Sequence, residues 1–172
     1  FLSGKVDEPE EKIKITKMAW ETKGTRSVKN AITIKGQSNF KNTAKDILIT
    51  SDTIVWLDDK AIGKPKDEND AFKMIKKLSD KTHEVVTSIC FTLKSEQRIV
   101  NTITKVTFKA LSDAEISYYV TKYKPLDKAG AYGIQEWIGA IAITSVNGSY
   151  NNVVGLPTHL LYETLNDIAE GF

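Results

Sequence analysis

Polar residues interrupt the apolar pattern of the chain at several places after residue 46. The apolar runs Ile47–Ile49 and Ile54–Leu57 lie on either side of Ser51–Thr53, which predicts two short strands with a polar interruption between them. The runs His83–Leu93 and Arg98–Phe108 are rich in β-branched and aromatic residues, and a polar segment separates them. This arrangement predicts an antiparallel hairpin of two long strands.

Helical spacing of apolar residues predicts three helices. The first begins at an N-cap, Asp67 or Asn69, and ends near residue 79. The segment Ser112–Glu115 has the sequence of a capping box, which predicts a helix as far as residue 123. Pro157 suits the first turn of a last helix. The apolar positions of that helix are Leu160, Leu161, Leu165 and Ile168.

Three shorter signals complete the pattern. Residues 130–133 predict a loop, Ile138–Thr144 predicts a strand, and Asn147 with Gly148 predicts a tight turn. Asp58 and Asp59 have the composition of a further turn. Strands and helices interleave, and the hairpins exclude a purely parallel sheet. We therefore expect a single α/β domain over residues 1–172, with a mixed sheet that contains hairpins and is flanked by helices.

Composition narrows the class of protein without identifying it. Of the 172 residues, 41% are hydrophobic and 27% are charged, and the formal net charge is +2. The charge is too nearly balanced to indicate nucleic-acid binding, and no apolar run approaches the roughly 18 residues of a membrane span. The lone Cys90 excludes an intramolecular disulfide and suits a reducing compartment. We expect no nucleic-acid partner, no membrane insertion and a cytoplasmic location.

Two polar positions in the first half of this pattern could carry chemistry. Asp52 is a carboxylate between apolar segments, so it either caps a turn or lies at a strand end that faces a cleft. Lys64 follows Gly63 and precedes Pro65, in a loop where glycine permits a ligand to approach the backbone. Lys64 could meet a phosphate as a point charge, or it could be one of many solvated surface lysines.

The third polar segment is Asp127–Gln135. Small residues surround one lysine, one tyrosine and one glutamine there. The amide of Gln135 could both donate to and accept from the edge of a base. The alternative is a tight turn that requires glycine. His83 and His159 lie far apart without Cys or Glu at suitable spacing, so no zinc site is expected.

Taken in order, these blocks resemble the Maf (septum formation protein) family, and the resemblance covers roughly residues 46–168. Each block is weakly specific by itself, and the ordered series is what carries the resemblance. The blocks are Ser51-Asp52-Thr53-Ile54-Val55, Gly63-Lys64-Pro65, Leu78-Ser79, Thr82-His83-Glu84-Val85, Asp127-Lys128-Ala129-Gly130-Ala131-Tyr132-Gly133-Ile134-Gln135, Gly148-Ser149-Tyr150 and Val153-Val154-Gly155-Leu156-Pro157.

The resemblance implies a nucleoside triphosphate pyrophosphatase that uses Mg²⁺ or Mn²⁺, on a fold akin to the inosine triphosphatases. By position, Asp52 corresponds to the family's proton acceptor near the metal, and Lys64 to a lysine that meets the triphosphate. Thr53 and Gln135 correspond to residues that discriminate between substrates. The form of the loop that ends at Gln135 is similar to the branch that prefers dTTP and UTP, with modified pyrimidine triphosphates as further candidates.

The N-terminal part of the chain departs from the family pattern. Family members open with a Ser-x-Ser-Pro-Arg-Arg loop, which does not occur in this sequence. Either that loop is missing upstream or the chain is an incomplete homologue, and we favour the first. Phe1–Gly4 is then expected to be the end of the helix that follows the loop. By resemblance, Glu8 is a candidate metal or phosphate ligand, and Lys23 a candidate substrate-binding residue.

Other functions remain open at the level of sequence. The enzyme could act on 7-methyl-GTP or other non-standard nucleotides. The chain could also be a non-catalytic nucleotide-binding regulator of cell division, as the family name suggests. The resemblance also suggests a homodimer.

Overall fold

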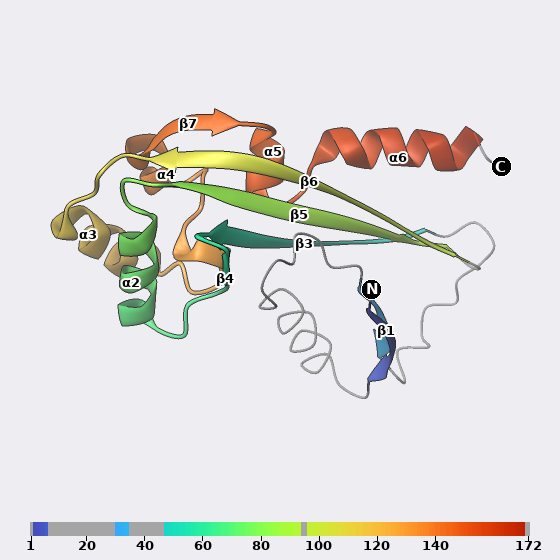
Figure 1. Cartoon of the computed structure of the whole chain (residues 1–172), viewed down its shortest axis with the longest axis horizontal. Coiled ribbons are helices and arrows are strands. Elements are labelled where there is room, and N and C mark those ends of the chain that lie inside the picture. The colour runs from blue at the N-terminus through green and yellow to red at the C-terminus, as the bar shows by residue number, and fades with distance from the viewer. Residues whose placement is uncertain (1, 7–29, 35–46, 94–95, 171–172) are drawn as a thin grey trace. The chain divides into compact units, whose positions relative to one another are not determined.

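A five-stranded sheet organises the larger part of the chain (Figure 1). The structure, a computed structural model, describes residues 2–6, 30–34, 47–93 and 96–170. The strand order is β4-β3-β5-β6-β7, and neighbouring strands run in opposite directions. The bounds are β3 (Leu48–Leu57), β4 (Lys60–Ile62), β5 (Thr82–Thr92), β6 (Gln97–Phe108) and β7 (Ile143–Asn147).

A second, two-stranded sheet is formed by β1 (Leu2–Val6) and β2 (Asn30–Ile34), which pair in parallel. The expected α/β class, with hairpins and helices, is confirmed. Among the described residues, parallel pairing occurs only between β1 and β2. The expectation that the chain opens with the end of a helix is wrong for Leu2–Gly4, because the backbone there is extended and pairs with β2.

The region around Asp52 is one continuous strand and not two. The polar residues 51–53 lie in the middle of β3, and the strand continues to a turn at Asp58 and Asp59. Both turn residues have positive φ, 50° and 59°, which suits a two-residue hairpin between paired Leu57 and Lys60. The predicted turn is confirmed. The predicted break is wrong, because polar side chains on an exposed strand face do not interrupt its backbone pairing.

The three predicted helices are confirmed, and local sequence explains their ends. Asp67 caps α2 (Glu68–Leu78) by accepting the backbone N–H of Asp70 at 2.7 Å. Ser112 and Glu115 form both hydrogen bonds of a capping box at the start of α3 (Asp113–Tyr123). The last helix, α6 (Thr158–Glu170), begins directly after Pro157.

The predicted strand Ile138–Thr144 is wrong, because most of it is the helix α4 (Trp137–Ala142), and β7 begins only at Ile143. An apolar run of this length suits a strand or a buried helix equally. Gly139 lies so close to the Ile134 carbonyl that an added Cβ would be 1.8 Å from the oxygen, so the helix needs glycine there. A short helix, α5 (Tyr150–Val154), was also not predicted. It follows Gly148, whose φ of 131° makes the bend that the sequence indicated.

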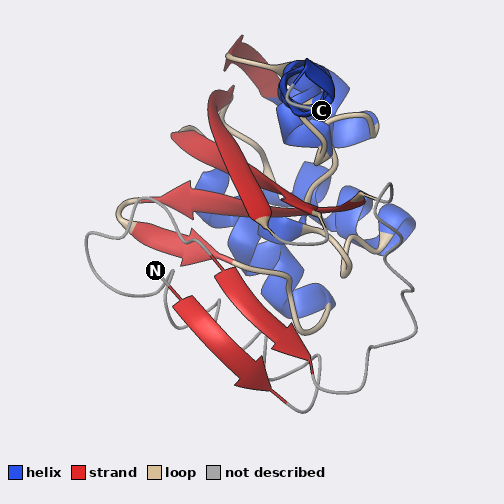
Figure 2. Ribbon diagram, turned by 90° about the vertical axis from the view of Figure 1, so that its right-hand side faces the viewer, coloured by secondary structure: helices blue, strands red, loops and turns tan. Residues whose placement is uncertain are grey.

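One hydrophobic core joins the helices to the sheet. Figure 2 shows the helices beside the strands that they cover. Side chains of α2, α3 and α4 pack with those of β3, β5 and β6 in a single cluster. Fully buried members include Ile75, Leu78, Val106, Ile116 and Tyr119. Contacts divide the chain into two compact units, and this core lies in the unit made of residues 51–89 and 100–172. Every described site residue discussed below belongs to that unit.

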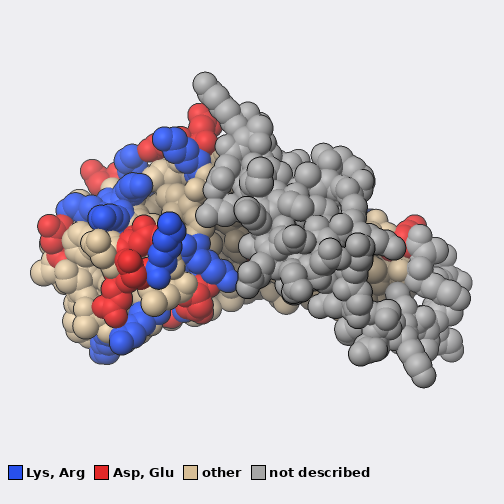
Figure 3. Space-filling model, turned by 90° about the horizontal axis from the view of Figure 1, so that it is seen from below, with Lys and Arg blue, Asp and Glu red and all other residues tan. Residues whose placement is uncertain are grey.

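The described surface carries charges of both signs. On the face drawn in Figure 3, acidic and basic side chains are interspersed over the coloured part of the molecule. This distribution agrees with the net charge of +2. Within the described ranges, no helix combines the length and the apolar character needed to cross a bilayer.

Candidate active site

Asp52 lies on β3 with its carboxyl group at the surface. Its Oδ1 accepts the backbone N–H of Thr53 at 2.9 Å. Desolvation by the surrounding protein raises the pKa of Asp52 above its ordinary value of 3.8, while the Thr53 N–H and the charge of Lys64 act to lower it. Because desolvation dominates, Asp52 is a stronger base than a free carboxylate.

The residues on either side of Asp52 are tied to α5 and the segment after it. Ser51 Oγ donates to the carbonyl of Gly155 at 2.9 Å. Thr53 Oγ1 lies 2.9 Å from Thr87 Oγ1, and Thr87 Oγ1 donates to the carbonyl of Asn152 at 2.9 Å. Because the proton of Thr87 goes to that carbonyl, Thr53 is the donor to Thr87. These hydrogen bonds hold the backbone that carries Asp52 on both sides.

The loop at Lys64 and the loop at 127–135 lie together in the folded chain, which the sequence did not predict. The backbone N–H of Gly130 donates to the carbonyl of Gly63 at 3.0 Å. The Lys64 charge lowers the pKa of Asp52 and is also the weakest of several influences that lower the pKa of Asp127. Lys64 is exposed and forms no ion pair with another described residue.

Lys128 differs from Lys64 because carboxylates surround it. Its Nζ lies 2.9 Å from Asp127 Oδ1 and 3.2 Å from Glu136 Oε1. Burial alone would lower the pKa of Lys128, but the two carboxylates outweigh burial and raise it. Lys128 stays charged, and its charge is compensated within the protein.

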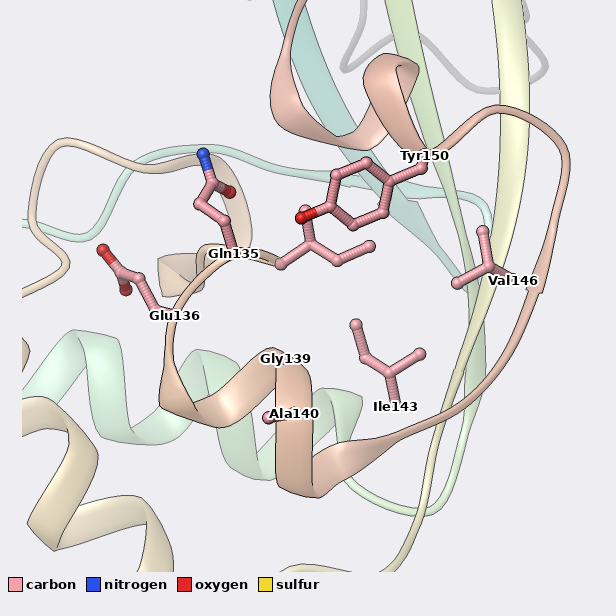
Figure 4. Close-up of a pocket in the computed structure, with 8 residues that line it drawn as sticks. Gln135, Glu136, Gly139, Ala140, Ile143, Val146 and Tyr150 are labelled. Carbon is pink, nitrogen blue, oxygen red and sulfur yellow. The ribbon is translucent and has the colours of Figure 1, made fainter.

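Gln135 is exposed beside an open hollow of about 310 Å³ (Figure 4). Ile143, Val146 and the ring of Tyr150 line the hollow together with Gln135 and Glu136. In Figure 4, Tyr150 and Ile143 lie on opposite sides of this space. The hollow therefore combines an aromatic ring and aliphatic walls with two polar groups, the amide of Gln135 and the carboxylate of Glu136, which suits a planar ligand with a polar edge.

The structure thus brings Asp52, Thr53 and Lys64 into one region and connects it through the backbone to the loop of Gln135. Glu8 and Lys23 lie outside the described residues. The sequence did not single out Tyr119, Thr87 or Asn152, although all three are buried polar residues that hold site segments. For Thr87 the sequence offered one signal, a polar residue inside the apolar-rich run His83–Leu93.

The described residues do not contain a set of side chains that could hold a metal ion without further ligands. Those residues contain no cluster of three or more His, Cys, Asp or Glu suited to a metal ion. Mg²⁺ commonly takes only one or two carboxylates and completes its shell with substrate phosphates and water. The exposed carboxylate of Asp52 fits that kind of site.

Comparison with known proteins identifies the family of the chain. The family model described as "Maf-like protein" matches residues 2–168. The match covers nearly the whole chain, including β3, both site loops and α5. The chain belongs to the Maf family, as the ordered motifs predicted.

Three curated relatives share the name "dTTP/UTP pyrophosphatase". The protein of Flavobacterium psychrophilum is 62% identical over 117 residues, covering 68% of this chain and 60% of the relative. That of Flavobacterium johnsoniae is 58% identical over 123 residues, covering 72% and 63%. That of Christiangramia forsetii is 58% identical over 131 residues, covering 75% and 67%. The matched part of the chain thus spans about three fifths to two thirds of the length of these relatives.

Proposed function

We propose that the protein hydrolyses dTTP and UTP to the monophosphate and pyrophosphate. The observation that carries the proposal is that Lys64 lies near enough to Asp52 to act on the pKa of its carboxyl group, which partial burial raises. Lys64 is itself exposed and forms no ion pair with another described residue. The names of the curated relatives, at 58–62% identity, support the choice of reaction and substrate.

The proposed reaction is the attack of water on the α-phosphorus. A bond forms between the water oxygen and that phosphorus, and the bond from the α-phosphorus to the bridging oxygen breaks, so pyrophosphate leaves. Asp52 accepts the proton of the attacking water, a role for which its raised pKa suits it. Lys64 stabilises the negative charge that moves toward pyrophosphate as the bond breaks.

A divalent cation, Mg²⁺ or Mn²⁺, completes the proposal. When bound, it would supply further positive charge against the triphosphate. Asp52 is the candidate ligand within the described residues, and Glu8 remains a sequence-based candidate for the second. Lys23 likewise remains a candidate contact to the substrate. The cytoplasm is the proposed location, in keeping with a single cysteine, and the proposed assembly is a homodimer.

The pyrimidine ring is proposed to lie in the hollow beside Gln135. A volume of about 310 Å³ is at the lower end of the range of about 300–1,000 Å³ for ligand pockets. The ring of Tyr150 offers a stacking surface, and the amide of Gln135 offers a donor and an acceptor to the base edge. Thr53 is the second residue proposed to discriminate between substrates.

The test is a product analysis with the full-length gene product. It is incubated with dTTP, UTP and 7-methyl-GTP in the presence of Mg²⁺ or Mn²⁺, in water enriched in ¹⁸O. We expect monophosphate and pyrophosphate from dTTP and UTP, with ¹⁸O in the monophosphate because water attacks the α-phosphorus. Asp52→Asn should bind nucleotide and lose roughly 10²–10⁴-fold in turnover, the range for general acid–base catalysis.

Other outcomes of this product analysis would contradict parts of the proposed function. Preferred turnover of 7-methyl-GTP would move the protein to the non-standard nucleotide branch. Release of nucleoside diphosphate and inorganic phosphate, or incorporation of ¹⁸O into pyrophosphate, would contradict the proposed bond cleavage. Binding of nucleotide with no turnover of any triphosphate would leave a role as a nucleotide-binding regulator. Retained turnover in Asp52→Asn would remove Asp52 from the role of base.

A further inference from the structure

A backbone hydrogen bond closes the turn that carries Gln135. The backbone N–H of Glu136 donates to the carbonyl of Gly133 at 3.0 Å, so Ile134 and Gln135 occupy the two central positions. Ile134 is buried and Gln135 is exposed. In Figure 4, Gln135 and Glu136 leave the turn in different directions. Gln135 is thus the residue presented to a ligand, and Glu136 is the residue that returns to the protein.

One phenol group connects the two ends of this turn. The backbone N–H of Gly133 donates to the hydroxyl oxygen of Tyr119 at 3.1 Å. The same hydroxyl donates to Oε2 of Glu136. The direction is fixed, because a backbone N–H can only donate and the single phenol proton then goes to the carboxylate. Tyr119 itself is fully buried in α3, so the anchor is part of the core.

The other oxygen of Glu136 is also engaged. Oε1 lies 3.2 Å from Nζ of Lys128, and the side chain of Glu136 is only 21% exposed. Gly133 makes this position available, because an added Cβ there would lie 3.0 Å from the carboxyl carbon of Glu136. Gly133, Glu136 and Tyr119 therefore form one packed unit under the turn. A hydrogen bond to a charged acceptor inside such a unit is stronger than one at the surface.

We propose that Tyr119 and Glu136 are positioning residues that set base recognition by fixing the turn that carries Gln135. The proposal rests on the proposed function, in which Gln135 contacts the base. Tyr119 does not line the hollow. Glu136 does line it, and the two oxygens of its carboxylate are held by Tyr119 and Lys128. The effect of Tyr119 and Glu136 is to hold the amide of Gln135 in one place relative to the hollow, so that little conformational freedom is lost when the base binds.

The experiment measures the part of the affinity that depends on the base. Dissociation constants for dTTP and for inorganic tripolyphosphate, which lacks a base, are determined by calorimetry with the full-length protein carrying Asp52→Asn. Tyr119→Phe and Glu136→Ala are added singly. We expect each substitution to raise the dissociation constant for dTTP, relative to that for tripolyphosphate, by about three- to tenfold. This is the range for one neutral hydrogen bond, here the bond between the Gln135 amide and the base.

Tyr118→Phe is the matched control. Tyr118 is the neighbour of Tyr119 on the same helix, is 45% exposed, and its hydroxyl bonds to Lys122 at the surface. The same chemical change there should leave the ratio of the two affinities unchanged. Glu136→Gln is the conservative variant, because its amide oxygen can still accept the Tyr119 proton. Its affinity for dTTP relative to tripolyphosphate should therefore fall less than that of Glu136→Ala.

A double-variant comparison tests whether the effect passes through Gln135. In a Gln135→Ala background, Tyr119→Phe should cause no further change in the ratio, because the presented amide is already absent. An equal loss in that background would overturn the proposal, and so would an unchanged ratio in both Tyr119→Phe and Glu136→Ala. If Tyr119→Phe does not fold, the proposal is tested by the affinity ratios of Glu136→Ala and Glu136→Gln. Turnover of dTTP by the wild-type protein is measured separately, so a failure of the proposed function is recognised independently.

Discussion

The carboxyl group of Asp52 illustrates how strand geometry and local electrostatics prepare a single residue for chemistry. Its neighbours Ser51 and Thr53 are hydrogen-bonded to other segments of the chain, so the backbone that carries it is fixed. Desolvation raises its pKa, and Lys64 partly opposes that change. A base near a cation is thus tuned by two effects of opposite sign, and removal of either should be measurable.

The first prediction concerns this balance. If Asp52 is the base, kcat/KM for dTTP falls as the pH falls through the pKa of Asp52, which lies above 3.8. Lys64→Met removes an influence that lowers the pKa, so the acid limb should move to higher pH. The measurement is the pH profile of kcat/KM between about pH 4 and 8.

The matched control for Lys64→Met is Lys66→Met. Lys66 is an exposed lysine in the same loop, and it is not among the influences on the Asp52 pKa. Its substitution should leave the midpoint of the acid limb in place. An acid limb that does not move in Lys64→Met, or moves equally in both variants, would contradict the assignment of Asp52 as the titrating base.

At the scale of elements, the short helix α5 and strands β3, β5 and β6 are joined by buried polar groups. Asn152 is completely buried on α5, and its Nδ2 donates to the carbonyl of Val85 at 3.0 Å and to Thr104 Oγ1 at 2.8 Å. Its backbone carbonyl accepts from Thr87, which in turn accepts from Thr53. A continuous path of hydrogen bonds therefore connects α5 to the strand that carries Asp52.

The second prediction is that Asn152→Ala lowers the free energy of unfolding by about 2–3 kcal/mol, because it creates a cavity and leaves the buried Val85 carbonyl without that donor. Urea denaturation measures the loss. Asn151→Ala is the matched control: Asn151 is exposed, and its amide bonds only to Thr158 at 2.9 Å among the described side chains. We expect that variant to change stability by less than about 1 kcal/mol. Equal losses in the two variants would show that the buried side chain of Asn152 contributes nothing specific to stability.

Sequence predicted the elements whose ends depend on neighbouring residues. The cap at Asp67 and the capping box at Ser112 are formed within one turn of chain, so local pattern suffices. The apolar run Ile138–Thr144 suits either a strand or a buried helix. In the folded chain most of it is helical, and the helix lies so close to the Ile134 carbonyl that only glycine fits at position 139. Periodicity does not contain that contact.

Some residues of the candidate site could be identified from the sequence and others only from the structure. Asp52, Lys64 and Gln135 stand in recognisable blocks, so resemblance to a family identifies them without a structure. Thr87, Tyr119 and Asn152 act through partners that lie from 14 to 67 positions away in the sequence. Only the folded chain shows which distant groups they hold, and so their roles could not be read from spacing.

At the scale of the whole molecule, one buried histidine couples folding to pH. His83 is 1% exposed, and its Nε2 lies 2.7 Å from the hydroxyl of Tyr132. The rings of Phe108 and Tyr132 contact it edge-on, with centroids 5.1 Å and 5.4 Å away. Its Nδ1 has no hydrogen-bond partner among the described residues. A second proton on this ring would therefore be buried without compensation.

The last prediction follows from that burial, which lowers the pKa of His83 from 6.5 to about 4. Between these values the unfolded chain binds more protons than the folded one, so stability is complete above pH 6.5 and is lost as the pH falls toward 4. The shift corresponds to a loss of about 3 kcal/mol by pH 4. Urea denaturation from pH 7 to pH 4 should show this slope in the wild type, and His83→Gln should remove it even if that variant is less stable throughout. His159→Gln, at an exposed position, should keep the wild-type slope. A slope that persists in His83→Gln would assign the acid sensitivity to the carboxylates and not to His83.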